Sequence, residues 1–259
     1  MRTERVLYRV HLSADALMVC EVHAQRGSRR VARKARFAFA AGERPAAMQA
    51  LGEWMGVAPQ RRPRETQQWV LGTSDVRYLL LPWTPDLADQ ALRSAFAAAL
   101  FEQQFKQDPG LYALRFARPV YGCALLAAFV PQSLLAELDA HAVASGVRLV
   151  STAPSLATVW DRFGAVLQRE TGEVRVMEGD RQIIVRHVRG RMNEVLLRPF
   201  DAAGDEALPS SHATEAGFRF FAAVPLSHAS AGAALPLADG DGFLATQDAA
   251  YAFALCGVF

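Results

Sequence analysis

Residues 6–40, VLYRVHLSADALMVCEVHAQRGSRRVARKARFAFA, decide the fold of this chain. Three apolar segments, at 6–12, 17–23 and 29–40, are separated by the short turns SADA and AQRGS. Because strand-like runs at this spacing with turn residues between them are typical of hairpins, the stretch predicts an antiparallel meander. Residues 45–56 then carry a helical pattern, so the chain opens with three predicted strands and a helix.

Two further strands and a long helix are predicted next. Residues 67–73 and 76–83 are apolar runs of the kind found in strands buried on both faces. Thr84 stands at an N-cap position and Pro85 at the first helical position, which predicts a helix that begins there. The Asp-Pro-Gly of residues 108–110 ends this helix.

A strand–helix–strand unit closes the first half. Residues 110–117 and 121–130 form a hairpin-like pair. A predicted helix at 131–145 leads into an extended run at 147–152. This order indicates that part of the sheet is parallel, because a parallel connection needs a crossover of about a dozen or more residues.

The second half repeats the opening pattern. A short helix is predicted from Pro154 through Trp160, and a strand at 218–226 and a helix at 248–258 end the chain. Between them, strand-like segments separated by turn residues predict a second meander: 165–170, 173–179, 181–188 and 191–200. The two similar halves indicate a duplicated α/β unit.

Residues 70–105 and 121–156 resemble the cytoplasmic actin-like domains of PilM-type proteins of type IV pilus assembly and GspL-type proteins of type II secretion. In both, an apolar strand ending in a corner such as LPW leads into a long helix, and a strand–helix–strand unit follows. The resemblance implies an α/β, duplicated ribonuclease-H-like (actin-like ATPase) fold with two lobes, each a mixed sheet with flanking helices. The first lobe would span 1–160, with an inserted subdomain at about 67–130, and the second 161–259.

The resemblance also implies a nucleotide cleft between the lobes, with a phosphate loop, typically Asp-x-Gly, in the first hairpin turn of each. The turn at 11–17 has no glycine, and the second turn has its acids and glycine in the wrong order. A side chain blocks the close approach of backbone to phosphate that glycine allows. The vestigial nucleotide-binding positions would be Ser13, Asp15, Glu178, Gly179, Asp180 and Gly217.

These departures predict a non-enzymatic scaffold without catalytic residues, cofactor or metal. The alternative is an ATP-binding enzyme of the same fold, a kinase or ATPase that uses ATP and Mg²⁺. Histidines in this sequence form no H-E-x-x-H pattern or other pair four residues apart, which gives no support to a metal site.

Positive charge is concentrated at the front of the chain. Residues 1–77 carry fourteen Lys and Arg against seven Asp and Glu, whereas residues 78–259 have a net charge of −5. Period-two alternation would place Arg30, Lys34 and Arg36 on one strand face, opposite Val31, Ala35, Phe37 and Phe39.

The cluster Arg29, Arg30, Lys34 and Arg36 is thus either a solvated sheet face or a docking patch for an acidic partner or the inner leaflet. Nucleic acid is not expected as a partner, because no interleaved aromatic residues accompany the charges.

Location and partners follow from the remaining patterns. The longest apolar runs fall well short of the roughly 20 residues that span a bilayer, and the first twenty residues have no continuous apolar core typical of a signal peptide. We therefore expect a cytoplasmic protein. By resemblance it would bind a short cytoplasmic peptide of an inner-membrane pilus or secretion protein, in a groove beside the inserted subdomain. A motor ATPase is a further partner, and these partners would recruit the chain to the inner face of the inner membrane.

Overall fold

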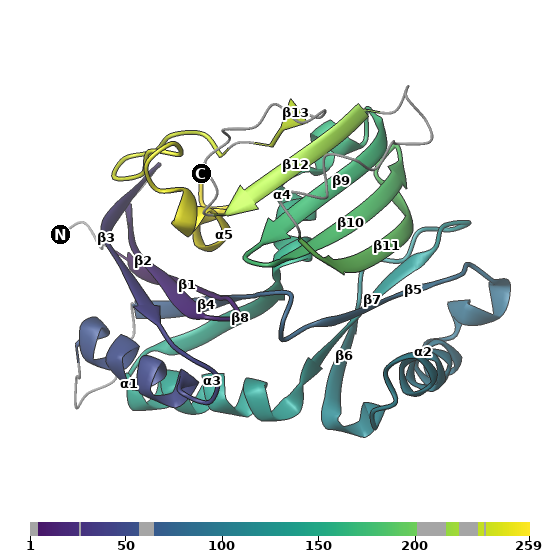
Figure 1. Cartoon of the computed structure of the whole chain (residues 1–259), viewed down its shortest axis with the longest axis horizontal. Coiled ribbons are helices and arrows are strands. Elements are labelled where there is room, and N and C mark those ends of the chain that lie inside the picture. The colour runs from purple at the N-terminus through teal and green to yellow at the C-terminus, as the bar shows by residue number, and fades with distance from the viewer. Residues whose placement is uncertain (1–4, 26, 57–64, 201–215, 223–232, 236) are drawn as a thin grey trace.

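Three β-sheets form the framework of the protein (Figure 1). The computed structural model describes residues 5–25, 27–56, 65–200, 216–222, 233–235 and 237–259. Each large sheet has five strands and the small sheet has three. Among these residues, no helix is both long and apolar enough to cross a bilayer.

The first large sheet has the strand order β3-β2-β1-β4-β8. Its strands are β1 (Arg5–Leu12), β2 (Ala16–Gln25), β3 (Ser28–Ala38), β4 (Glu65–Leu71) and β8 (Arg148–Pro154). The first three strands pair antiparallel, while β4 lies parallel to both β1 and β8. The predicted meander is confirmed, and part of the sheet is parallel as expected. The predicted crossover from the strand at 121–130 to the strand at 147–152 is wrong, because the first of these strands belongs to the small sheet and β8 pairs with β4 instead.

The second large sheet repeats this arrangement, with the order β11-β10-β9-β12-β13. Its strands are β9 (Thr171–Glu178), β10 (Arg181–Val188), β11 (Arg191–Pro199), β12 (Ala216–Ala222) and β13 (Ala233–Ala234). Again three strands form a meander, and β12 lies parallel to β9 and β13. The predicted strand at 218–226 begins inside β12, and its end lies outside the described residues.

The small sheet and a long helix form an inserted subdomain. The sheet contains β5 (Arg77–Leu81), β6 (Tyr112–Phe116) and β7 (Leu125–Pro131), with β7 in the centre. The helix is α2 (Gln90–Phe105), and a 3₁₀ turn, η2 (Pro109–Leu111), precedes β6. Buried Leu81, Phe101 and Phe129 give this subdomain a hydrophobic core of its own. The predicted bounds of the insertion, about 67–130, fall within β4 at one end and within β7 at the other.

The start of α2 differs from the prediction. Thr84 makes no side-chain capping bond, and Pro85 instead opens a 3₁₀ turn, η1 (Pro85–Ala88). The N-cap is Asp89, whose carboxylate accepts a hydrogen bond of 2.9 Å from the backbone N–H of Leu92. Thr84 and Asp89 are both suitable capping residues, and only one of them can be placed at the helix start.

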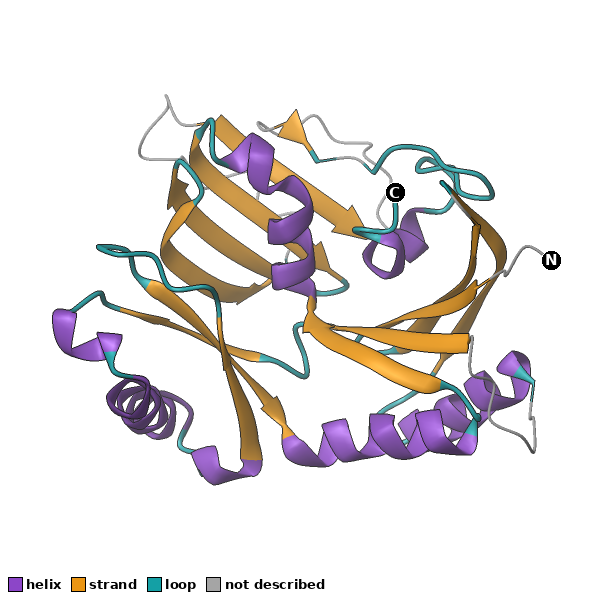
Figure 2. Ribbon diagram, turned by 180° about the vertical axis from the view of Figure 1, so that it is seen from behind, coloured by secondary structure: helices purple, strands orange, loops and turns teal. Residues whose placement is uncertain are grey.

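Helices cover both faces of the first sheet (Figure 2). On one face lie α1 (Arg44–Met55) and α3 (Gln132–Ala144), which contact each other as well as the sheet. On the other lie α4 (Ser155–Leu167), the 3₁₀ turn η3 (Ala249–Tyr251) and the short α5 (Ala252–Leu255). Because α4 and α5 also contact strands of the second sheet, the two lobes share one hydrophobic core.

The end of α4 corrects a second prediction. Residues 165–170 were expected to form a strand, but the helix that starts after Pro154 continues to Leu167. Val159, Phe163 and Leu167, four residues apart, are buried on one face of α4, which is the spacing of a helix. The second meander therefore has three strands, and the predicted lobe boundary after residue 160 lies within α4.

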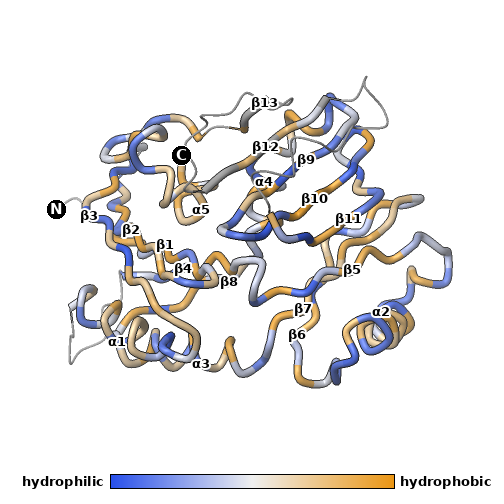
Figure 3. Tube along the Cα trace, viewed as in Figure 1, coloured by the Kyte–Doolittle hydropathy of each residue, from blue (hydrophilic) through white to orange (hydrophobic). Residues whose placement is uncertain are grey.

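A β-bulge in β3 corrects the expected arrangement of the basic cluster. Glu21 pairs with Arg33 but the next residue, Val22, pairs with Val31, so β3 has one extra residue. An extra residue reverses which face the following side chains occupy. Arg30 therefore lies on the face opposite Lys34 and Arg36, and Val31 shares their face. Figure 3 shows that this outer strand is more hydrophilic than much of its neighbours β1 and β2.

Candidate functional site

The edge of the first sheet that faces the second lobe is the candidate site. Because β1, β4 and β8 are parallel, the residues that follow them meet at one edge: Ser13 after β1, Gly72 and Thr73 after β4, and Ser155 after β8. In open α/β sheets, ligands bind outside this carboxyl edge. The second lobe contributes Glu178, the last residue of β9.

The side chain of Glu178 lies at this edge and bonds to the first lobe. His11 Nε2 donates a hydrogen bond of 2.7 Å to Oε1, because an ionised carboxylate only accepts. Oε2 accepts from the backbone N–H of Thr73 at 2.9 Å and from Ser155 Oγ at 3.4 Å. His11 and Ser155 are fully buried and Glu178 is almost so, which means that the carboxylate has exchanged water for protein donors.

Gly72 makes this close approach sterically feasible. A Cβ at this position would lie 2.0 Å from Glu178 Oε1 and 2.6 Å from the carbonyl oxygen of Leu12. Both distances are below van der Waals contact, so no other residue fits without movement of the backbone. The N–H of Gly72 also donates to the Leu12 carbonyl at 2.8 Å, which fixes β4 beside β1 at this edge.

The surroundings of the carboxylate are buried and combine an aromatic ring with titratable groups. The ring of His11 packs on Phe253 of α5 with 4.7 Å between centroids, and its Nδ1 has no hydrogen-bond partner among the described residues. Burial raises the pKa of the Tyr78 phenol, and the negative charge of Glu178 raises it further. Burial likewise raises the pKa of Asp75, which the guanidinium of Arg44 opposes from 3.1 Å.

Of the six predicted nucleotide positions, only Ser13 and Glu178 are buried at this edge. Ser13 Oγ lies 2.9 Å from both the Asp15 carboxylate and the Ala16 carbonyl, to one of which it donates its single hydrogen, and it accepts from the N–H of Ala16 at 3.0 Å. These bonds stabilise the tight β1–β2 turn. Asp15 is exposed and lies 3.5 Å from Arg36.

Gly179, Asp180 and Gly217 are not brought to the edge. The first two form the exposed β9–β10 turn, where Gly179 has a positive φ of 60°. Gly217 pairs with Glu173 of β9, five residues from Glu178, which is roughly 16 Å along the strand.

His11, Gly72, Thr73 and Ser155 were not identified as site residues from the sequence. A signal for some of them exists, because Thr73 ends the predicted strand at 67–73, and Gly72 and Ser155 directly follow the observed parallel strands β4 and β8. In the part of the chain that the structure describes, no cluster of three or more metal-ligating side chains is present. The backbone N–H of Thr73 after β4, a donor that could bind an anion at this edge, is used by Glu178.

Residues of the predicted partner-binding cluster contact the C-terminal segment of the chain. Lys34 Nζ lies 2.6 Å from Asp248 and donates to the Gly242 carbonyl at 3.0 Å. Arg29 donates to the Val258 carbonyl. Together with the bulge that turns Arg30 away, these contacts mean that the cluster largely fastens the C-terminal segment to β3.

Comparison with solved structures identifies the fold. The cytoplasmic domain of EpsL, an inner-membrane component of the type II secretion system of Vibrio cholerae, superposes with a TM-score of 0.57 at 14% identity, over 98% of this chain and 95% of that chain. A chain of the PilM–PilN type IV pilus biogenesis complex gives 0.52 at 18% identity, over 80% of this chain and 64% of that one. A Bacteroides thetaiotaomicron protein with an actin-like ATPase fold and unknown function gives 0.52 at 8% identity, over 78% and 72%.

The sequence itself matches no family model and no curated protein. At these identities the superpositions are evidence for the fold alone. They agree with the repeated strand order of the two large sheets. The chain therefore has the actin-like ATPase fold, and the resemblance to the actin-like domains of pilus and secretion proteins that its sequence indicated is confirmed at the level of the fold.

Proposed function

We propose that this chain is a non-enzymatic, actin-like cytoplasmic scaffold of a bacterial pilus or secretion assembly. It binds the cytoplasmic segment of an inner-membrane partner, which recruits it to the inner face of the inner membrane, and a motor ATPase is a further partner. The proposal is supported by the similarity to EpsL, an inner-membrane component of a secretion system, and to a PilM–PilN complex. Fold alone does not fix function, so the proposal also rests on the residues at the candidate site.

The buried carboxylate of Glu178 is the observation that carries it. In this fold a nucleotide would place its phosphates between the lobes, where backbone N–H groups can bind them. Here the N–H of Thr73 and the imidazole of His11 already bind a carboxylate of the protein itself. A triphosphate would have to displace this internal anion, and the displaced charge would have to be accommodated elsewhere.

Titration with Mg-ATP tests the non-enzymatic part of the proposal. We expect no heat of binding in calorimetry and no change in the urea-unfolding midpoint. The second readout is sensitive, because a ligand present at a thousandfold excess over its Kd would add about 4 kcal/mol to the free energy of unfolding. Saturable binding in the micromolar range would contradict the scaffold and favour a kinase or ATPase.

An exposed aromatic surface on the inserted subdomain supports the partner-binding part. Tyr121 is 88% exposed, and its ring stands 4.9 Å from that of Trp83, with Val120 also exposed beside it. Exposed aromatic groups of this kind are enriched where proteins bind one another. The surface belongs to the subdomain beside which the resemblance places a partner peptide.

Site-specific cross-linking in cells tests this part. A photo-reactive phenylalanine analogue in place of Tyr121 is expected to yield one adduct with an integral membrane protein. The same residue at Val143, which is 81% exposed on α3, is the matched control and should give no such adduct. Equal labelling at both positions, or an adduct only with soluble proteins, would contradict recruitment through the inserted subdomain.

A further inference from the structure

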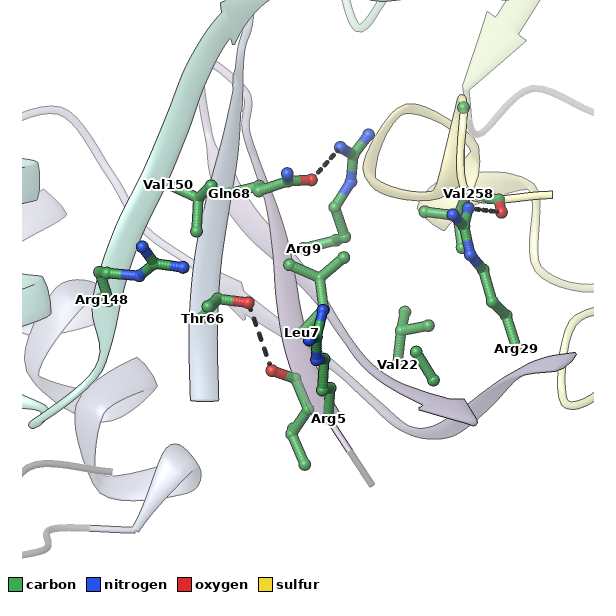
Figure 4. A pocket seen from close by; sticks show the side chains of 13 residues that line it. Arg5, Leu7, Arg9, Val22, Arg29, Thr66, Gln68, Arg148, Val150 and Val258 are labelled. Carbon is green, nitrogen blue, oxygen red and sulfur yellow. Dashed lines mark hydrogen bonds between the residues drawn. The ribbon is translucent and has the colours of Figure 1, made fainter. Parts of the chain in front are cut away.

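A basic groove lies on the first sheet, away from both the candidate site at Glu178 and the inserted subdomain (Figure 4). It occupies the amino-terminal half of β1 on the face that carries α5, where the helix no longer covers the strands. Its volume is about 810 Å³, and the C-terminal residues Gly257 and Val258 form one wall. The side chains that line this groove include Arg5, Leu7, Val22, Arg29, Gln68 and Arg148.

The polar groups that line the groove are donors that lack acidic partners. Among the described residues, its lining includes four arginines, the fourth being Arg9, and no Asp or Glu. Arg9 is committed to the fold, because it donates to the carbonyls of Ala254 and Cys256 and to Gln68. The side chains of Arg5 and Arg148 are exposed and make no hydrogen bond or ion pair with any described residue.

The pairing register spreads these charges across the sheet. Arg29 of β3 and Arg5 of β1 both pair with Ala24 of β2, so they stand two strands apart on one face. Arg148 of β8 pairs with Thr66 of β4, which places it two strands from β1 in the other direction. Strands lie about 4.8 Å apart, so Arg5 rises roughly 10 Å from Arg29 on one side and from Arg148 on the other, and the two outer arginines are about 19 Å apart.

We propose that this groove binds an extended acidic peptide from a protein partner, laid across the strands with a carboxylate at about every third residue. In a polyproline II segment, every third side chain points the same way at intervals of about 9.3 Å, which matches the spacing of the arginines. Apolar side chains between the carboxylates would contact Leu7, which is partly exposed, over the fully buried Val22. Arg148 can bind a carboxylate with two parallel hydrogen bonds, and Arg29 keeps N–H groups for a carboxylate beside the one that it donates to the Val258 carbonyl.

Other anions fit this shape less well. A single phosphate is held by donors that converge, and these arginines are spread over three alternate strands of the sheet. Gly257 and Val258 form a wall beside the charges, which favours a narrow extended chain over a flat lipid surface. Single-stranded nucleic acid binds through bases stacked on aromatic side chains, and no aromatic side chain is among the described residues that line the groove.

Fluorescence anisotropy on the full chain tests the proposal. The probe is a fluorescein-labelled peptide of repeated Asp-Leu-Pro, and the matched probe has Asn in place of Asp. We expect saturable binding of the Asp peptide that weakens with salt, and none of the Asn peptide. Arg148→Glu and Arg5→Glu should each weaken binding about tenfold, because each reverses a charge that faces a carboxylate.

The control variant is Arg191→Glu, which makes the same charge change on β11, outside the groove. The side chain of Arg191 is exposed and makes no hydrogen bond or ion pair with any described residue. It should weaken binding by less than about twofold if only general charge is altered. Equal losses in all three variants would overturn the proposal, as would equal affinity for the two peptides.

Vesicles containing phosphatidylglycerol and a labelled oligonucleotide form two further arms. If the Asp peptide fails to bind while the vesicles or the oligonucleotide bind in a way that depends on Arg148, the groove would be assigned to a membrane or to nucleic acid. That result would overturn the proposal of a peptide ligand. These results are independent of the scaffold proposal, because neither the Mg-ATP titration nor the Tyr121 cross-link involves the groove.

Discussion

Replacing Glu178 by alanine is expected to lower the free energy of unfolding by about 3–5 kcal/mol, the usual cost of removing one partner from a buried, charged hydrogen-bonded pair. The substitution leaves the fully buried His11 and the backbone N–H of Thr73 without their acceptor. Each of these donors was desolvated in folding and regains nothing from water. Urea unfolding followed by tryptophan fluorescence and circular dichroism measures the change.

Two variants make this result specific. Glu194→Ala removes a carboxylate from a half-exposed ion pair with Arg186, at 2.9 Å, and should cost less than about 1 kcal/mol. Glu178→Gln keeps one acceptor oxygen for Thr73 and should fall between the two. If Glu178→Ala cost no more than Glu194→Ala, the carboxylate would not join the lobes, and the observation behind the proposed function would be lost.

Replacing Gly72 by alanine is the second large effect, with an expected loss of about 3 kcal/mol. The added methyl would lie 2.0 Å from Glu178 Oε1 and 2.6 Å from the carbonyl oxygen of Leu12. The carboxylate can turn away, but the Leu12 carbonyl belongs to the backbone of β1 and cannot. The same urea titration reports the loss, and near-ultraviolet circular dichroism shows whether the lobes stay packed.

Gly164→Ala is the matched control, because a Cβ on this glycine of α4 meets nothing within 4 Å. It should stabilise the helix by about 0.5–1 kcal/mol, since alanine is the better helix former. The double variant Gly72→Ala, Glu178→Ala should be less destabilised than the sum of the two single variants, because one of the two clashes is then already removed. A loss at Gly72 no different from the change at Gly164 would contradict the close approach of the lobes.

The elements that the sequence predicted correctly are those with local causes. Turn residues between apolar runs specify the meanders of β1–β3 and β9–β11. The order of β7, α3 and β8 predicts a parallel crossover within one sheet, but β7 belongs to the small sheet and β8 pairs in parallel with β4. Two other errors are local and lie where two local signals compete. Thr84 and Asp89 both suit a helix start, and the apolar residues from Ala165 to Leu167 suit a strand as well as the last turn of α4.

The bulge in β3 has no signal in the period-two pattern. It depends on which residues of β2 lie opposite, and on the C-terminal segment, whose Asp241 carbonyl accepts from the N–H of Val31 at 2.8 Å. A one-residue shift reverses the faces of a strand, so the basic cluster could not be assigned to one face from spacing alone. The groove formed by Arg5, Arg29 and Arg148 likewise requires three strands that are far apart in the sequence.

By itself the sequence determined a duplicated α/β chain, because strand period, turn residues and helix caps act over a few positions. It also showed that the first hairpin turn lacks the glycine of a phosphate loop and that the second has its acids and glycine in another order. Only the tertiary structure decided what fills the resulting edge. His11 and Glu178 are 167 residues apart, and their contact exists because two separately formed sheets pack with their carboxyl edges together. Such packing depends on the shape of both lobes at once, and no local pattern encodes it.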